Sequence, residues 1–338
     1  MRAKEKNTKI GATRILLAFV VMIALLVGLF FLSVNLGSLP ISPSQMIRGL
    51  FFEFDPDVAT VYDVRFPRII IALIGGMALA ISGTMLQAVM KNPLTDPGII
   101  GISSAAALVG VIVTGLFPSL YFSIPLISIL GGLIAYLLIY SLAWDGGVIP
   151  TRLILVGVAL NMTFMGIAQG LAAMGGAGMS VTQSIVDGNI VQKTWSDVRL
   201  LAVYVGIGIF LAMFTARTCN LLSLDDQTAR GLGVNVNRDR FLVALIAILL
   251  ASVTTSIVGI IGFLGLLVPH IGRMIVGSNH KVLLPFSGLF GAWLLLLSDT
   301  VGRTIAYPYE VPAAVIMAMV GGPFFILLLK LGGKNYGN

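Results

Sequence analysis

The residues that most often carry chemistry in proteins are sparse in this chain. It has two histidines, His270 and His280, and neither has a partner at metal-ligand spacing. It contains no His-Glu-x-x-His motif and no Gly-x-Ser-x-Gly turn. A single cysteine, Cys219, excludes an intrachain disulfide. The residue types argue against an enzyme and predict no catalytic residue, no metal and no cofactor held by this chain.

One acid lies well inside an apolar stretch. Asp299 precedes Arg303 by four residues, so the two share a helix face and are expected to pair. An ion-coupled secondary transporter needs intramembrane groups that bind its coupling ion, and no other acid suits that role, which makes this class the weaker alternative. A primary transporter needs ATP. Because the chain lacks a GxxxxGK[ST] loop, a partner subunit would hydrolyse it.

The elements that position these residues must lie in a bilayer. Of 338 residues, 57% are hydrophobic and 10% are charged, against about 25% charged in a soluble domain. A soluble fold of this size cannot bury so much apolar surface. This excludes a soluble enzyme, a nucleic-acid-binding domain and a disordered chain.

Charge-free runs predict ten transmembrane helices, because a helix crosses the hydrocarbon in about 20 residues. Two runs are long enough to turn back once, near 117–119 and near 259–262. The expected spans are 15–34, 67–90, 98–116, 121–143, 150–172, 199–216, 240–259, 263–278, 283–303 and 311–330. The predicted fold class is an all-α integral membrane protein.

The basic residues predict the orientation. With the N-terminus inside, 15 of the 21 Lys and Arg fall in inward segments and 6 in outward ones. Both termini are expected in the cytoplasm, as a basic tail 1–14 and a short tail 331–338 around a membrane domain 15–330. The first apolar stretch is too long for a signal peptide and no small-x-small cleavage site follows it, so it is expected to remain as a span.

The polar inward loop 217–240 predicts a short helix on the membrane face. Ser223 can cap it, with Asp226 three residues later in the capping-box position, and Gly231 can end it in the left-handed conformation. Such a rigid element suits the transmission of force from a soluble motor, although a plain interfacial turn explains it equally well. The residues expected to contact an ATPase are Ser223, Asp226, Thr228, Ala229, Arg230, Gly231, Leu232 and Gly233.

Several motifs, in order along the chain, resemble one family. They are Phe66-Pro67-Arg68 and the stretches 75–87 (GGMALAISGTMLQ), 92–101 (NPLTDPGIIG), 228–234 (TARGLGV), 262–273 (GFLGLLVPHIGR), 297–303 (LSDTVGR), 310–312 (EVP) and 321–325 (GGPFF). This pattern resembles the permeases of iron–siderophore, haem and vitamin B12 importers, which are the membrane subunits of type II ABC importers.

The resemblance implies the type II ABC importer permease fold, with ten helices, in the bacterial cell membrane. It implies a second permease subunit, identical or related, with the cargo path on the shared axis. It also implies two ATP-binding cassette ATPases that use ATP and Mg, and an extracytoplasmic binding protein. Ferric siderophore is the expected cargo because it is the commonest in the family, with haem second and vitamin B12 third.

Three arginines, Arg65, Arg68 and Arg303, are expected at the outer ends of spans. The resemblance implies that arginines at these positions meet glutamates of the binding protein, since a guanidinium takes a carboxylate in two parallel bonds. The alternative is that Arg68 only caps its span at the membrane interface and that Arg303 only forms an ion pair with Asp299.

Small and polar residues are expected to pack helices. Gly76 and Gly83 lie two turns apart on a small-residue face that favours close contact, and Gln87 is expected to bridge helices. Two prolines and an Asx residue fix the inner turn that contains Asn92 and Pro93.

Two further structural residues are Pro269 and Asp299. In the family the fifth helix lines the pathway, so Asn161, Thr163 and Gln169 are candidates to line it or to bond between helices.

Two places depart from the family pattern. Ala313-Ala314 stands where Val-Gly usually follows the Glu-Val-Pro motif, and Asp187-Gly188-Asn189 lacks a Trp usually found before Gly-Ser. In the family both places face the outer gate or the pathway, so they leave the cargo open.

Overall fold

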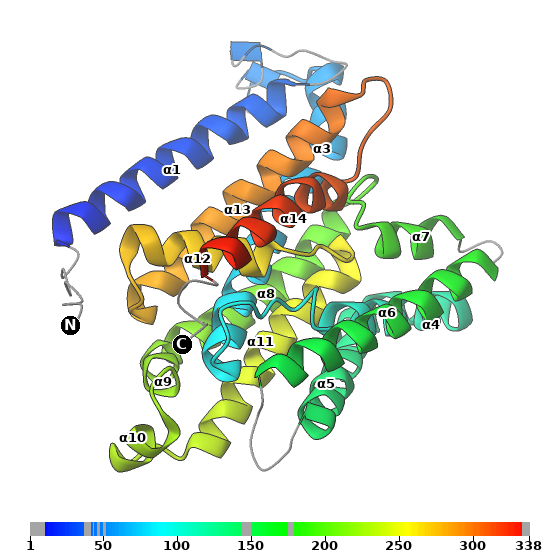
Figure 1. The fold of residues 1–338 in the computed structure, drawn as a ribbon. Coiled ribbons are helices and arrows are strands. Elements are labelled where there is room, and N and C mark those ends of the chain that lie inside the picture. The colour runs from blue at the N-terminus through cyan, green and yellow to red at the C-terminus, as the bar shows by residue number, and fades with distance from the viewer. Residues whose placement is uncertain are drawn as a thin grey trace.

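The computed structural model describes residues 11–36, 42, 44–45, 48–49, 52–143, 150–174 and 179–332. All the regular secondary structure in these ranges is helical (Figure 1). The elements are α1 (Ala12–Asn35), α3 (Pro56–Met90), α4 (Ile102–Leu116), η1 (Pro118–Ser123), α5 (Ile124–Ala143), α6 (Pro150–Met174), α7 (Met179–Asp187), α8 (Trp195–Phe214), α9 (Ala216–Leu222), α10 (Asp226–Gly231), α11 (Val236–Val258), α12 (Leu264–Val276), α13 (His280–Ile305) and α14 (Ala313–Gly332).

Each predicted span coincides with an apolar helix in the same order. Among the described residues, 7 helices are long and apolar enough to cross a membrane. Three further apolar stretches are shorter: α4, α12 and residues Ala313–Leu328 of α14. With 15 residues in α4 and 13 in α12, these two reach only about 20 Å, less than the ~30 Å hydrocarbon core. An irregular turn precedes each of them, at 91–101 and 259–263.

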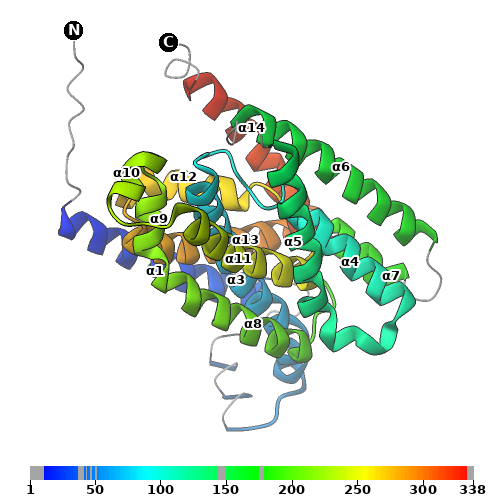
Figure 2. The same ribbon diagram turned by 90° about the horizontal axis from the view of Figure 1, so that it is seen from below.

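Helix α3 forms the centre of the bundle, packed mainly against α13 and α11. Figure 2 shows these three helices in the middle, with α1 and α6 on opposite sides. Helix α3 begins at Pro56 rather than near 67, because Asp55 accepts hydrogen bonds from the backbone of Asp57 and Val58 and a proline at the first position favours a helix start. Pro67 therefore lies inside the helix instead of opening it.

Two glycines bring α3 into backbone contact with its neighbours. A Cβ on Gly76 would lie 2.2 Å from the carbonyl oxygen of Gly291 on α13, and a Cβ on Gly83 would lie 2.2 Å from that of Gly265 on α12. No side chain fits at either position. The small-residue face expected of this helix therefore packs at two separate crossings.

Two short helices were not expected. Helix α7 lies in the loop after α6, and α9 extends the chain beyond α8. We call the end of the bundle with residues 216–235 the α10 end and the end with residues 179–197 the α7 end; Figure 1 shows them far apart. The expected tails lie largely outside the described residues, since the structure describes 11–14 of the first and 331–332 of the second, the latter as the end of α14.

Candidate functional site

The two irregular turns meet inside the bundle. Asp96 is fully buried in the first turn, where its Oδ1 accepts hydrogen bonds from the backbone of Gly98 (2.8 Å) and Ile99 (3.0 Å). A Cβ on Gly98 would lie 3.0 Å from the carbonyl oxygen of Ile261, in the second turn. A Cβ on Gly265 would lie 2.9 Å from Asp96 Oδ2. The turn that precedes α4 therefore packs against the start of α12.

Gln87 ties the same region together. Its Nε2 donates to the carbonyl oxygens of Gly265 (3.1 Å) and Thr95 (3.3 Å), so it links α3 to α12 and to the first turn. Asn92 Oδ1 accepts the backbone N–H of Leu94 at 2.9 Å, which closes the Asx turn around Pro93. The side chain of Gln87 thus bridges helices as the sequence predicts, and Pro269 is buried within α12.

The short helix at the α10 end differs in its caps from the prediction. It begins at Asp226, and Asp225 precedes it without a side-chain cap bond. Ser223 is not the cap, because its hydroxyl donates instead to the carbonyl oxygen of Cys219 at 2.8 Å, which ends α9. The left-handed residue is Gly233, with φ of 82°, rather than Gly231. The predicted capping box does not form.

Asp226 bonds two cations in place of a cap. Its Oδ1 accepts from the ammonium of Lys91 and, at 3.0 Å, from Nη2 of Arg240. The hydrogen bond from Lys91, with the charge of Arg240, holds the pKa of Asp226 below its ordinary value.

Most of α10 and the residues after it face solvent. Ala229 is its buried side chain, whereas Leu232 is 62% exposed. The other residues expected to contact an ATPase that are exposed are Ser223, Thr228, Arg230, Gly231 and Gly233. A polar segment with an exposed leucine is the kind of surface that a partner protein covers.

The three arginines expected to face outward bond within the chain. Arg68 donates to the Asp299 carboxylate from Nε (2.9 Å) and Nη2 (2.8 Å), and from Nη1 to Glu310 Oε2 (2.8 Å). Arg65 donates to the carbonyl oxygen of Val34. Arg65, Arg68 and Arg303 are each only 9% exposed.

The expected pair of Asp299 with Arg303 is therefore wrong. Asp299 bonds Arg68 from another helix, because α3 and α13 touch at Gly76 and bring the guanidinium alongside the carboxylate. Arg303 instead donates to the hydroxyl of Ser33 at 2.7 Å and to the carbonyl oxygen of the same residue, which ties α13 to α1.

The candidate pathway residues lie on α6, a helix with an uncovered face. Thr163 is exposed and donates to the carbonyl oxygen of Ala159 at 2.9 Å. Gln169 is exposed, and half-buried Asn161 has an Oδ1 without a partner in the described part of the chain. A Cβ on Gly166 would meet nothing within 4 Å. These three side chains do not form one hydrogen-bonded cluster.

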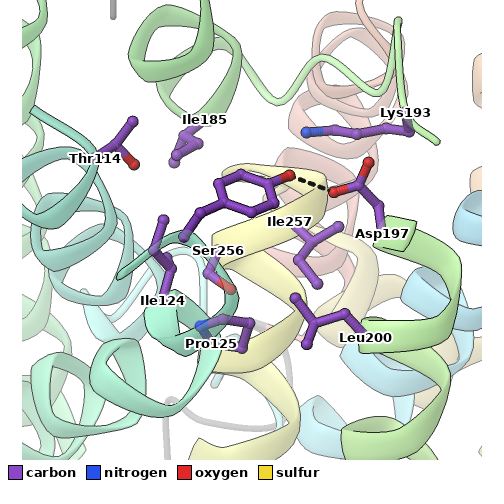
Figure 3. A pocket seen from close by; sticks show the side chains of 10 residues that line it. Thr114, Ile124, Pro125, Ile185, Lys193, Asp197, Leu200, Ser256 and Ile257 are labelled. Atoms are coloured by element: carbon purple, nitrogen blue, oxygen red, sulfur yellow. Dashed lines mark hydrogen bonds between the residues drawn. The ribbon is translucent and has the colours of Figure 1, made fainter. Parts of the chain in front are cut away.

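A polar cluster forms around the buried carboxylate of Asp197 at the α7 end (Figure 3). Tyr121 of η1 donates to Asp197 of α8, and the other carboxylate oxygen accepts from the backbone and hydroxyl of Thr194 at 2.8 and 2.9 Å. Lys193 lies near Asp197 in Figure 3 and lines a cavity of about 20 Å³, and burial lowers the pKa of this lysine. Sequence reasoning missed this cluster, although Thr194 followed three residues later by Asp197 is a capping-box signal.

The two departures from the family pattern touch each other. Gly188 has φ of 61°, and a Cβ there would lie 2.6 Å from the Cβ of Ala314 and 2.5 Å from the carbonyl oxygen of Ile260. Because Gly188 has no side chain, the segment after α7 can pack closely against α14 and the second turn.

The fold and the site define a helical multi-pass membrane protein whose polar groups link helices and loops. Residues 24–330 match the FecCD transport family. The chain belongs to the FecCD transport family and is an ABC importer permease of the type II class.

Similar proteins support this assignment. The chain is 40% identical over 319 residues to "Probable heme-iron transport system permease protein IsdF" of Staphylococcus aureus strains MSSA476 and MW2. The matched region covers 94% of this chain and 97% of the relative. It resembles the solved structure "An inward-facing conformation of a putative metal-chelate type ABC transporter", with TM-score 0.77, 30% identity and coverage of 93% of this chain and 98% of that one. PsaBC from Streptococcus pneumoniae in complex with Fab shares the fold, with TM-score 0.55, 18% identity and coverage of 85% and 95%.

Proposed function

We propose that this permease imports haem iron. The observation that carries the proposal is the 40% identity, over nearly the whole chain, to relatives named as heme-iron permeases. The sequence motifs favoured ferric siderophore only because it is the commonest cargo of the family. The motifs cannot rank cargoes, because they lie where helices pack and turns form, as Gly83 and Gln87 do.

The permease works in an assembly. We propose that the uncovered face of α6 meets a second permease subunit, identical or related, and lines the cargo path between them. Support comes from its exposed Thr163 and Gln169 and from the open space at Gly166, since small residues let membrane helices approach closely. The proposed orientation, with both termini inside, rests on the 15 to 6 distribution of Lys and Arg.

The proposed ATPase contact is α10 with the residues around it. With the termini inside, this segment faces the cytoplasm, and its exposed Leu232 and Arg230 offer a mixed apolar and polar surface. Two ATPase subunits, one beneath each permease, would hydrolyse MgATP.

The binding protein is proposed to dock where α1, α3 and α13 come together. Docking through Arg65, Arg68 or Arg303 requires a rearrangement, because each already bonds a group of its own chain. Among the described residues, the exposed charges nearest to them in sequence are acidic: Asp63 and Glu310. Arg68 becomes available to a partner carboxylate when Glu310 moves away.

Growth with a defined iron source tests the cargo. Cells that carry this chain are compared with cells in which it has been deleted, with haem or a ferric siderophore as sole iron source. The proposal expects the deletion to abolish growth on haem and spare growth on the siderophore, with restoration by the gene in trans. The reverse dependence would assign the siderophore as cargo and overturn the proposal.

A further inference from the structure

One oxygen atom at the α10 end joins three separate elements. Asp226 Oδ1 on α10 binds the ammonium of Lys91 and the guanidinium of Arg240. Lys91 follows α3 directly and opens the turn 91–101, with a left-handed φ of 50°. Arg240 lies in the first turns of α11. The carboxylate therefore holds α10 against the start of the first irregular turn and the start of α11.

The two elements held by Asp226 meet again inside the bundle. The turn that starts at Lys91 continues to Asp96 and Gly98, which pack against Gly265 and Ile261. Helix α11, which carries Arg240, ends at Val258 and runs directly into the turn 259–263. A displacement at Asp226 thus reaches the contact between the two irregular turns by both routes, through the first turn and along α11.

Few other contacts hold α10 in place. Of its six residues, Ala229 is the one that is buried, and its preceding residue makes no side-chain cap bond. The helix is joined to the bundle by the chain on either side, by Ala229 and by the two ion pairs of Asp226. Its position relative to α3 and α11 therefore depends strongly on that carboxylate.

We propose that Asp226 is a positioning residue that transmits displacement of α10 to the two irregular turns, and so sets how much cargo is moved per ATP hydrolysed. The inference rests on the proposed function, in which an ATPase contacts α10. The ion pairs are partly exposed, at 37% for Asp226, 31% for Lys91 and 11% for Arg240. Pairs of this exposure contribute little to folding stability, so loss of the carboxylate leaves the permease folded. It also removes the one group that holds Lys91 and Arg240 together, so α10, the first turn and α11 lose their shared contact.

The test uses the permease reconstituted in vesicles with its ATPase and its binding protein, loaded with haem. The variants are Asp226→Asn, Lys91→Met, and the exchange of Asp226→Lys with Lys91→Asp. Lys281→Met is the matched control for the loss of a cation, because Lys281 is exposed at the start of α13, lies outside the proposed ATPase contact, and forms no ion pair in the described structure. Each variant is measured for ATP hydrolysis and for cargo accumulated.

We expect Asp226→Asn and Lys91→Met to lower cargo moved per ATP by about 3- to 10-fold with ATP hydrolysis maintained. The exchange should recover part of the loss, and Lys281→Met should match the wild type. Wild-type ratios in both single variants would overturn the inference, as would a loss that the exchange does not relieve. Lys91→Met decides the matter if Asp226→Asn fails to assemble. Failure of the wild type itself to move haem would instead count against the proposed cargo.

Discussion

Arg68 and Asp299 form a buried ion pair across the contact between α3 and α13. The guanidinium donates from Nε and Nη2 to the carboxylate, which is 1% exposed, and uses its remaining nitrogen for Glu310 at the surface. The two residues are 231 positions apart in the sequence. A buried charge that loses its partner is costly, so this pair constrains how the two halves of the chain associate.

Removal of one partner should therefore destabilise the permease. We expect Asp299→Leu to lower the free energy of unfolding by about 3–5 kcal/mol, because the Arg68 guanidinium stays buried and keeps only the exposed Glu310 as a counter-charge. The midpoint of thermal unfolding in detergent measures the effect. The double variant Asp299→Leu with Arg68→Met should recover most of the loss. Equal melting temperatures for the single variant and the wild type would contradict the assignment of this pair.

The glycine contact between α3 and α13 predicts opposite effects of the same substitution at two sites. Gly76→Ala places a Cβ against the carbonyl oxygen of Gly291, and overpacking of this kind costs about 1–3 kcal/mol or more. Gly115→Ala on α4 meets nothing within 4 Å and should gain up to about 1 kcal/mol from helix propensity. Thermal unfolding of both variants checks this, and a neutral Gly76→Ala would show that the helices are not in contact there.

The cluster at the α7 end should hold the loop before α8 in place. Tyr121→Phe removes the hydrogen bond to Asp197 and leaves that buried carboxylate with fewer donors. We expect amide hydrogen exchange, measured by mass spectrometry, to become faster in residues 188–197 and to change less elsewhere. Tyr309→Phe is the control, because Tyr309 is 79% exposed. Unchanged hydrogen exchange in Tyr121→Phe would show that this hydroxyl does not hold the loop before α8 in place.

The proposed orientation predicts opposite labelling of the two ends. In a Cys219→Ser background, a membrane-impermeant thiol reagent should label a cysteine at Glu53 in intact cells. It should label a cysteine at Asn237 only after the cells have been permeabilised. Both positions are exposed, so access to reagent depends on the side alone. Labelling of both from the same side would contradict the distribution of basic residues as a guide to this topology.

The order of the helices could be predicted from the sequence because long charge-free apolar runs are stable as helices that cross the bilayer. The start of α3 at Pro56 was missed because charged residues such as Asp57 and Asp63 precede the apolar run, although Asp55 and Pro56 are a helix-start signal. Helix α7 was missed because its nine residues lie in a loop that hydropathy does not distinguish.

Contacts between distant residues could not be predicted in the same way. The four-residue spacing favours Arg303 as the partner of Asp299, and only the close crossing of α3 and α13 selects Arg68 instead. Ser223 had a matching acid three residues later, but a local bond to the carbonyl oxygen of Cys219 competes with capping. The meeting of the turns at Asp96 and Gly265 likewise depends on packing rather than on local pattern.

The central claim is that this chain carries haem iron across a membrane with energy from a partner ATPase. The most direct measurement is accumulation of radio-iron-labelled haem in vesicles that hold the permease and ATPase, with haem-loaded binding protein outside. The account predicts accumulation that requires MgATP, stops with a hydrolysis-deficient ATPase, and is not reduced by excess ferric siderophore. Uptake of ferric siderophore with no uptake of haem, or haem uptake without ATP, would contradict it.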